Sequence, residues 1–449
     1  MRAGTAPLRV AVAGAGMAAA RFAHQALSLA RPGALEVTLY GREAHAPYNR
    51  ALLTGALAGR YAPTALELPA GDADVRPGTE ITALDPQART LRTATGQSVR
   101  YDALVLAIGA EAVLPDIRNL HEPADREPGP DPRRLTGTTT STGLRVRTST
   151  CPDPRTHTPP AAGRRLKGGV HTLRTLDDCA RLAEDVPRAR RAVVIGGGVL
   201  GVGTAHALAA RGLPVHLVHH APHLMERHLD APAAATVRRA LEGMGVTVHL
   251  GAGVCALLGD DHVTGLELAD GRLLESELAV LTCGARPRTR LARAAGLTVA
   301  GGVVVDDTLA ASAPGVYAIG DCAEHRGTVH GRAEAAWEQA DVLAARLSGA
   351  RPDARYTGSP RILRLSAGPL QIAALGDSAG HHGTGTDTLR LADATRGTYR
   401  KLALRGTELT GAILVGDLAT AGDLIHAFER GEPLAPDPLH LLTTEGDPL

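Results

Sequence analysis

Apolar and polar positions follow the same order in two segments of the chain. Residues 8–43 begin with an apolar run, pass through a glycine-rich turn, continue with apolar positions at helical spacing and end in a second apolar run. Residues 191–220 repeat this order. Each segment is predicted to form a βαβ unit of the mononucleotide-binding kind, so two nucleotide sites are expected.

Other patterns occupy the rest of the chain. Between Arg118 and Lys167 the composition changes to Pro, Arg, Thr, Asp and Gly, which cannot bury enough apolar surface to order itself. This segment is interpreted as a disordered surface insertion, with a docking segment as the alternative. From about Tyr356 onward, short apolar runs alternate with glycine-containing turns, and a helical stretch follows. A small C-terminal α+β domain is predicted there.

Length, charge and cysteine content narrow the class of protein. With 449 residues, the chain is expected to form two or three domains. Its 48 basic and 47 acidic side chains leave a net charge of +1, so no nucleic-acid partner is expected. The five cysteines lack a C-x-x-C or ferredoxin-like spacing and are interpreted as reduced thiols, and no metal site is predicted.

The hydropathy pattern also bears on where the protein works. No run approaches the roughly 18 consecutive apolar residues of a membrane span. The first strand begins near Leu8, which leaves no room for a signal peptide. A cytoplasmic protein without a membrane segment is therefore expected.

The first glycine turn has the pattern G-x-G-x-x-A, formed by Gly14, Gly16 and Ala19 between a strand and a helix. Glycine permits the tight turn and lets the backbone approach a pyrophosphate, which the free amides of a helix N-terminus favour. A nucleotide is predicted at this turn, in contact with Ala15 and Met17 as well.

Two carboxylates stand where the first nucleotide would need hydrogen-bond acceptors. Glu43 lies near the end of the second strand, where an acid accepts hydrogen bonds from the adenosine ribose; the alternative is an exposed loop glutamate. Asp321 follows Gly320 and a buried strand, where it could accept hydrogen bonds from the sugar-alcohol hydroxyls of a flavin. In the alternative interpretation Asp321 caps the next turn.

Two apolar strands end in small residues, as is needed where backbone packs against a ligand. The first spans residues 101–110 and includes Ala107 and Gly109, and the second spans residues 279–289. Each could also be a buried strand that stops at a glycine. Their pairing with two nucleotide turns favours the ligand-binding interpretation.

The second glycine turn is a complete G-x-G-x-x-G, formed by Gly196, Gly198 and Gly201. At the matching strand end stand His219 and His220 instead of an acid, so the usual acceptor for a ribose 2′-hydroxyl is missing. Strict preference for NADH is not supported by this pattern. NADPH or dual use is possible, because a histidine can contact a 2′-phosphate.

Together these residues resemble the pyridine nucleotide-dependent FAD oxidoreductases. More narrowly, the chain is similar to the reductase module of NAD(P)H assimilatory nitrite reductase large subunits and to rubredoxin and ferredoxin reductases. The resemblance covers nearly all of the chain outside residues 118–167. It depends on the motifs PYNRALLTG (47–55), TLDDC (175–179), PHLMERHLD (222–230), AIGDCAEH (318–325), AAWEQA (335–340), YTGS (356–359), GTYRKLALR (397–405) and GAILVGD (411–417).

The resemblance implies an α/β fold with two Rossmann-like three-layer domains, one for FAD and one for NAD(P), plus a small C-terminal α+β domain. The FAD domain is split in sequence by the NAD(P) domain, and the C-terminal domain carries a partner or homodimer surface. The implied divisions are a first FAD-binding segment (1–117), the insertion (118–167), the NAD(P)-binding domain (168–278), a second FAD-binding segment (279–350) and the C-terminal domain (351–449).

Further site residues follow from the resemblance alone. It implies that Arg50 lies at the flavin or its phosphates, and that Glu80 and Ile81 flank the adenine end. The helix of Trp337 would border the isoalloxazine ring. Trp337 is a weak catalytic candidate that could cover this ring, or it could be a core anchor.

The sequence departs from these relatives at two places. Gly203 stands where they usually have a Glu near the nicotinamide and flavin. Hydride transfer needs close, oriented rings more than a particular acid, so activity could survive at reduced efficiency. Arg332 and Glu334 replace part of an apolar segment and could mark an altered acceptor site.

The predicted activity is transfer of electrons from NADH or NADPH through FAD to an external acceptor. Cysteine clusters for an iron-sulfur centre or sirohaem are missing from the sequence, so the chain is not expected to reduce nitrite itself. A ferredoxin-like protein or a nitrite reductase subunit is the expected partner. The alternatives are a catalytically impaired FAD-binding redox sensor or assembly protein and, less favoured, a monooxygenase.

Overall fold

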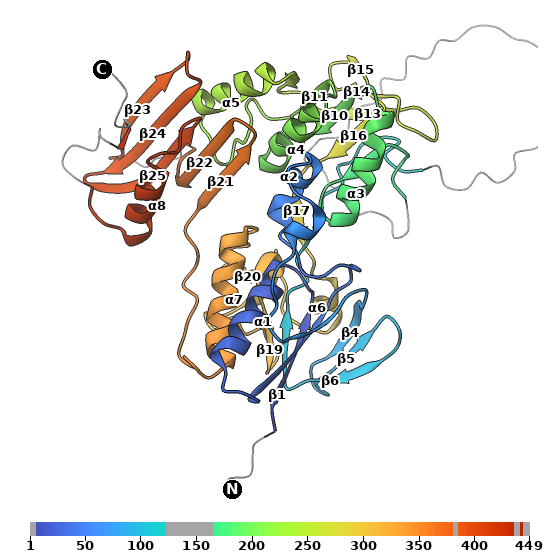
Figure 1. Cartoon of the computed structure of the whole chain (residues 1–449), viewed down its shortest axis with the longest axis vertical. Helices are drawn as coiled ribbons and strands as arrows, with labels where there is room; N and C mark the ends of the chain where they lie inside the picture. Colours follow the sequence, from blue (N-terminus) through green and yellow to red (C-terminus); the bar gives the residue numbers. More distant parts are fainter. Residues whose placement is uncertain (1–5, 123–164, 380–384, 435–440, 443–449) are drawn as a thin grey trace, which may run out of the picture.

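The computed structural model describes residues 6–122, 165–379, 385–434 and 441–442. They form two domains built on parallel sheets and a C-terminal domain built on an antiparallel sheet (Figure 1). The first domain contains both residues 8–112 and residues 285–350, so the second domain is inserted within it. The predicted fold class is confirmed.

A five-stranded parallel sheet with the order β19-β7-β1-β2-β3 forms the centre of the first domain. Helices α1 and α7 pack against each other, and a three-stranded antiparallel sheet, β4-β5-β6, completes the layers. Alanine fills most of the buried face of α1, which lets the two helices approach closely. The elements are β1 (Leu8–Ala13), α1 (Met17–Leu29), β2 (Leu35–Tyr40), η1 (Arg50–Leu52), α2 (Leu53–Leu57), η2 (Pro63–Leu66), β3 (Asp74–Arg76), β4 (Ile81–Asp85), β5 (Thr90–Thr93), β6 (Ser98–Arg100), β7 (Ala103–Leu106), β8 (Ala110–Ala112), β17 (Ala285–Pro287), α6 (Arg290–Ala294), β18 (Val303–Val305), β19 (Val316–Ala318), η5 (Gly320–Cys322), β20 (Ala323–His325) and α7 (Ala333–Leu347).

The second domain repeats this topology with the order β12-β11-β10-β16-β9 and its own antiparallel sheet, β13-β14-β15. Helix α4 is apolar on nearly all sides because it packs against β10 and β11, against α2 of the first domain and against β21. The elements are β9 (Val170–Thr172), α3 (Leu176–Asp185), η4 (Val186–Arg188), β10 (Ala192–Ile195), α4 (Val199–Ala210), β11 (Val215–Val218), α5 (Ala231–Gly243), β12 (Val246–His249), β13 (Val254–Leu258), β14 (Gly265–Leu268), β15 (Leu273–Glu275) and β16 (Leu278–Leu281).

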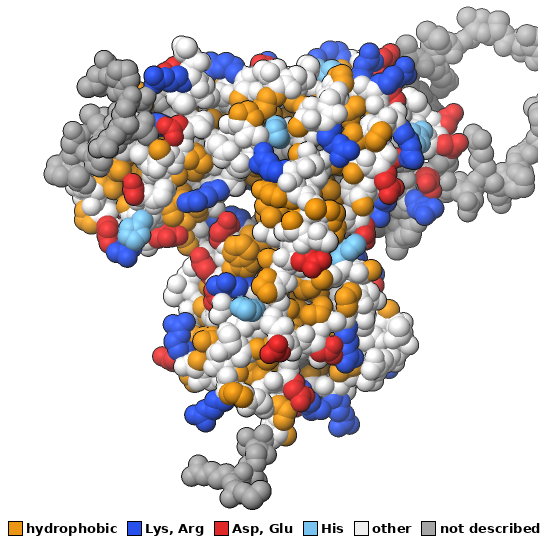
Figure 2. All heavy atoms as spheres, in the orientation of Figure 1, with side chains coloured by type: hydrophobic (Ala, Val, Ile, Leu, Met, Phe, Trp, Pro, Cys, Tyr) orange, Lys and Arg blue, Asp and Glu red, His pale blue; other side chains and the backbone are white. Residues whose placement is uncertain are grey.

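The C-terminal domain is an antiparallel sheet with the order β21-β22-β25-β24-β23, covered by α8. Figure 2 shows a hollow between this domain and the first domain, and acidic and basic side chains interspersed over the visible face. The elements are β21 (Ile362–Ala367), β22 (Leu370–Gly376), β23 (Asp387–Asp393), β24 (Thr398–Arg405), β25 (Glu408–Val415) and α8 (Ala421–Arg430).

Four predicted domain boundaries need correction. The division at residue 279 cuts through β16, which pairs with β10 in the second domain. Residues 118–122 and 165–167 belong to the fold, because Leu120 is buried and His121 pairs with Leu166; residues 123–164 lie outside the described residues. Tyr356 packs in the core of the first domain, so the C-terminal sheet begins only at β21.

The described residues also bear on the cysteine and membrane expectations. Cys179, Cys283 and Cys322 are free thiols. Cys255 is disulfide-bonded, so the expectation of reduced thiols throughout is wrong at this position. Among the described residues, no helix combines the length and apolar character needed to cross a membrane.

Candidate functional site

The first glycine turn lies between β1 and α1 and is closed on one side and open on the other. Gly14 has a φ of +116°, and a Cβ there would lie 2.2 Å from the carbonyl oxygen of Ala107. At Gly16 the nearest atom to such a Cβ would be Nε of Arg50, at 3.9 Å. The turn is therefore pressed against the end of β7 and faces Arg50. The other residues predicted here precede or begin α1, namely Ala15, Met17 and Ala19.

Arg50 is held over this turn by hydrogen bonds. Its Nη2 donates to Oε1 of Glu43, its Nη1 donates to the carbonyl oxygen of Arg174 at 2.9 Å, and its guanidinium lies 5.1 Å from the centre of the Tyr48 ring. Tyr48 donates to Oε2 of Glu43 at 2.5 Å. Both oxygens of Glu43, predicted to accept from a ribose, are thus engaged by the protein, and the visible role of Glu43 is to orient Arg50.

Asp321 lies on the same side of the domain as Arg50. It sits in η5, directly after β19, and its Oδ2 accepts a hydrogen bond from Nη2 of Arg174 at 2.8 Å. The preceding turn is fixed because the amide of Gly320 donates to Oε1 of Gln339 on α7 at 2.7 Å. The structure therefore joins Asp321 to Arg50 through Arg174.

Two arginines near Arg50 each have a guanidinium nitrogen without a hydrogen-bond partner. Among the described residues, Nε of Arg174 and Nε of Arg288 are buried without a hydrogen-bond partner. Burial, with smaller contributions from Arg42 and Arg50, lowers the pKa of Arg288 to about 10. Arg288 is half-buried and still carries its charge at neutral pH, and a partly buried cation without an anionic partner is unfavourable. These residues therefore fit an anionic ligand such as the diphosphate of FAD.

The small residues Ala107 and Gly109, which follow β7, lie beside these arginines and leave space for a ligand. Arg288 donates its backbone N–H to the carbonyl oxygen of Gly109 at 2.9 Å, and Ala107 bonds to the end of β1. Ile81 begins β4 and is 9% exposed in the core, and the carbonyl of Glu80 accepts from the amide of Ala94. The surroundings of Glu80 and Ile81 do not show an adenine site. Their assignment to the adenine end of FAD therefore stays a prediction.

The second glycine turn repeats the geometry of the first. A Cβ at Gly196, whose φ is +114°, would lie 2.5 Å from the carbonyl oxygen of Thr282, and one at Gly201 would lie 1.7 Å from the carbonyl oxygen of Gly196. At Gly198 no atom lies within 4 Å of such a Cβ. Close strand and helix packing on one side and free space on the other match a nucleotide-binding turn.

His219, directly after β11, differs from the expectation of a phosphate contact. It is 4% exposed, its Nδ1 accepts from the amide of Gly197 at 3.1 Å, and its Nε2 bonds to Oε2 of Glu226 at 2.9 Å. Both ring nitrogens are thus used within the protein. His220 is exposed, with its ring 4.9 Å from that of His219.

Gly203 lies where α4 meets α2. A Cβ at Gly203 would lie 3.2 Å from Cγ2 of Thr54, which is tighter than an ordinary contact. A larger side chain at residue 203 would have to displace Thr54. Gly203 therefore lies at a close contact between the first domain and the second.

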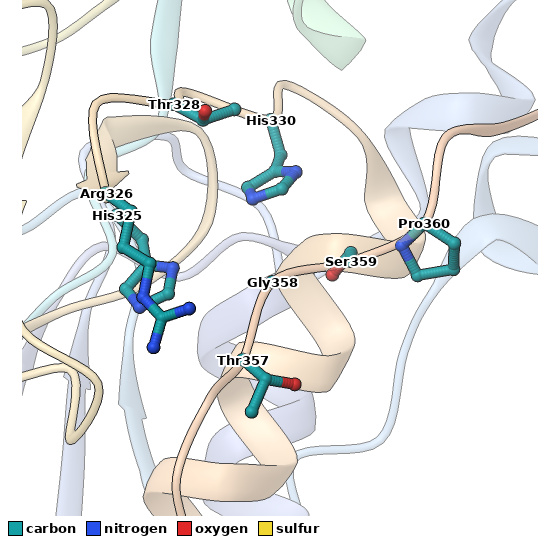
Figure 3. Close-up of a pocket in the computed structure, with 8 residues that line it drawn as sticks. All are labelled: His325, Arg326, Thr328, His330, Thr357, Gly358, Ser359 and Pro360. Atoms are coloured by element: carbon teal, nitrogen blue, oxygen red, sulfur yellow. The ribbon is translucent and has the colours of Figure 1, made fainter. Parts of the chain in front are cut away.

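Helix α7 contacts both the turn of Gly320 and the wall of a cavity of about 420 Å³ (Figure 3). This cavity lies between the end of β20 with its following loop and residues 357–360 of the linker. Glu338 accepts from Ser359 at 2.5 Å, next to the Gln339 that holds Gly320. Trp337, the residue before Glu338, is half-buried.

The two residues that could mark an altered acceptor site have different surroundings. Nη1 of Arg332 donates to the carbonyl oxygens of Pro360 and Ile362, at 2.8 and 3.0 Å, so Arg332 fastens the linker to α7. Glu334 is exposed on the first turn of the helix.

Sequence reasoning missed four polar residues of these sites. Arg174 lies between β9 and the capping box of α3, and Arg288 directly follows β17. A basic residue just after a strand is a signal from which both could have been predicted. The roles of Glu226 and Gln339 depend on contacts between separate elements and leave no local signal.

Comparison with known proteins agrees with this geometry. Residues 8–136 and 140–340 match the family described as pyridine nucleotide-disulphide oxidoreductase, and residues 364–432 match the C-terminal domain of rubredoxin NAD+ reductase. The chain is 30% identical to rubredoxin-NAD(+) reductase of Ectopseudomonas oleovorans, over 72% of this chain and 74% of that protein. The resemblance drawn from the sequence is confirmed.

Two further relatives cover more of the chain. It is 29% identical to a nitrite reductase [NAD(P)H] of Bacillus subtilis over 94% of its own length but spans only 47% of that protein, about half its length. A ferredoxin reductase of Rhodopseudomonas palustris has a TM-score of 0.75 with 25% identity, over 98% of both chains. The chain thus belongs to the pyridine nucleotide-disulphide oxidoreductase family, as an FAD-dependent oxidoreductase that uses NADH or NADPH.

Proposed function

We propose that this chain transfers electrons from a reduced nicotinamide nucleotide to an iron-sulfur protein. The observation that carries the proposal is the pair of open glycine turns on two topologically matched sheets, with α2 of one domain packed on α4 of the other. This packing would hold two nucleotides in a fixed relation, as hydride transfer requires.

FAD, when bound, would accept hydride from the nicotinamide and release electrons to the acceptor. The side chains supply position and charge. Arg50 and Arg288 would bind the diphosphate, Asp321 would accept hydrogen bonds from the ribityl chain, and Gln339 would keep the turn of Gly320 in place.

The match of residues 364–432 to a rubredoxin reductase domain supports a small iron-sulfur protein as acceptor. A nitrite reductase subunit is the second acceptor that we propose to test, because of the similarity to the Bacillus protein. The cavity of Figure 3 lies between the first domain and the linker to the C-terminal domain, and we propose this side for the approach of the acceptor.

An anaerobic titration tests the proposal directly. The FAD-loaded protein is titrated with NADH and, separately, with NADPH, while the visible absorbance of the oxidised flavin is followed. Rapid bleaching by at least one nucleotide, and reoxidation on addition of ferredoxin or rubredoxin, is expected. Bound flavin that neither nucleotide bleaches would contradict the reductase function.

That contrary result would favour a catalytically impaired redox sensor. The observation in favour of this second candidate is Gly203, which is packed against Thr54 and has no side chain to face the nicotinamide. A sensor would retain FAD but show negligible turnover with both nucleotides.

Replacing Arg288 by methionine should affect the apoprotein and FAD binding in opposite directions. Removal of a half-buried cation that is repelled by Arg42 and Arg50 should leave the apoprotein as stable as before or more stable. FAD affinity should fall by about ten- to a hundredfold, because hydrogen bonds to charged groups are lost. Thermal unfolding of the apoprotein and flavin fluorescence titration measure the two effects.

Arg286 provides the matched control. Its Nε donates to Glu111 at 2.7 Å on the surface, so Arg286→Met should leave FAD affinity within about twofold. Equal FAD affinity in the two variants would rule out Arg288 as a phosphate ligand.

A further inference from the structure

The nicotinamide site contains a carboxylate that does not lie at the usual position in the sequence. In βαβ nucleotide sites an acid at the end of the second strand accepts the adenosine 2′-hydroxyl. His219 occupies this place after β11, and its ring is bonded to the side chain of Glu226 in the following segment. The carboxylate thus reaches the strand end from a position seven residues further along the chain.

The hydrogen bonds of His219 occupy both of its ring nitrogens. A backbone N–H can only donate, so Nδ1 of His219 must present its lone pair to the amide of Gly197. The single ring proton is then on Nε2 and is donated to Glu226. Both ring nitrogens of His219 are therefore engaged within the protein, and contact of Nδ1 with a 2′-phosphate would require breaking the bond to Gly197.

Close packing holds Glu226 near the glycine turn. A Cβ at Gly197 would lie 2.6 Å from Cδ2 of Leu224 and 2.7 Å from Cγ of His219, and the amide of Met225 donates to the carbonyl oxygen of Gly197 at 2.9 Å. The segment before Glu226 is thus anchored on the turn that would hold the nucleotide. The Glu226 side chain remains 32% exposed and accessible to a ligand.

The charge at this position is negative at neutral pH. The hydrogen bond from His219 is the largest cause that lowers the pKa of Glu226 to about 2, and a smaller contribution comes from His220. The exposed Arg227 follows in sequence, and His228 beside it is half-buried. The carboxylate of Glu226 is hydrogen-bonded to His219, the residue that follows β11.

We propose that Glu226 replaces the missing strand-end acid, accepts the 2′-hydroxyl of the adenosine ribose and repels a 2′-phosphate, so that this chain prefers NADH to NADPH. This inference rests on the proposed use of the second turn for the nicotinamide nucleotide. It reverses the interpretation in which His219 and His220 favour a phosphate. His219 acts as a positioning residue, because it orients Glu226 without needing to touch the nucleotide.

Binding of the oxidised nucleotides tests this preference without any turnover. Titration calorimetry of the FAD-loaded protein with NAD+ and NADP+ should give a Kd for NADP+ at least about tenfold higher, since a like charge lies near the 2′-phosphate. Glu226→Gln keeps an acceptor for His219 but removes the charge. In this variant the ratio of the two Kd values should fall by about tenfold, mainly through tighter binding of NADP+. Glu226→Arg should bring the ratio below one.

Glu242→Gln provides the matched control, because it removes the same charge from an exposed pair on α5 of the same domain. Its ratio of Kd values should equal that of the unchanged protein. Equal affinity of the unchanged protein for both nucleotides, or equal ratios in Glu226→Gln and Glu242→Gln, would overturn the inference while the reductase function stands. If neither nucleotide bound, the proposed function would fall together with it.

Discussion

Gly201→Ala should abolish binding of the nicotinamide nucleotide while FAD remains bound. The added Cβ would lie 1.7 Å from the carbonyl oxygen of Gly196 and 2.9 Å from Oγ1 of Thr282. Neither the turn nor the end of β16 can retreat without opening the site between β10 and α4. A displacement of about 1 Å in such a site costs on the order of a hundredfold in function, so the Kd for NAD+ should rise by at least that factor.

Calorimetry with NAD+, together with the visible absorbance of bound FAD, checks this result. Gly243→Ala is the matched control, because Gly243 lies on α5 of the same domain and a Cβ there meets no atom within 4 Å. The control should bind NAD+ normally. Unchanged NAD+ affinity in Gly201→Ala, or simultaneous loss of FAD, would show that the close contact at this turn does not act on the nicotinamide site alone.

Lys401→Met should destabilise the attachment of the C-terminal domain by about 3–5 kcal/mol, the usual cost of removing one partner of a buried ion pair. The Lys401 side chain is 2% exposed, and its Nζ lies 3.2 Å from Oδ2 of Asp230 and donates to the carbonyl oxygen of Ser378 at 3.1 Å. Asp230 also accepts from Tyr399 at 2.9 Å and caps α5 of the second domain through Ala233.

Methionine retains the length of the lysine side chain and isolates the effect of the charge. Differential scanning calorimetry and limited proteolysis should show an earlier transition, because the protein has several domains and need not unfold in one step. In Arg238→Met, which breaks an exposed pair with Glu242, the change should stay below about 0.5 kcal/mol. Adding Asp230→Asn to Lys401→Met should recover some of the loss; an unchanged transition in Lys401→Met would contradict the expected role.

This ion pair also relates the C-terminal domain to the nicotinamide site. Asp230 ends the segment that carries Glu226, and Ser378 donates to the carbonyl oxygen of His228 at 2.8 Å. The C-terminal sheet thus supports the segment whose charge we propose to set the nucleotide preference.

Local patterns in the sequence were sufficient for the two βαβ units and their glycine turns. A strand, a tight turn and a helix each depend on residues that are close in sequence, so apolar spacing and glycine positions encode them directly. The same holds for the C-terminal α+β domain, because its short apolar strands and the glycines that end them can be identified in the sequence. The fold class and the cofactor class followed from these features and the motifs.

Only the tertiary structure decided which side chains meet. The last strand of the second domain, β16, was assigned to the wrong domain because an apolar run does not reveal its partner in a sheet. Arg174 reaches Asp321 from 147 residues away, and Lys401 reaches Asp230 from another domain. Glu43 and His219 were correctly seen as strand-end residues, but their hydrogen-bond partners determine what they can still bind. Such contacts depend on the path of the whole chain, and the sequence by itself determined only the local elements that the path connects.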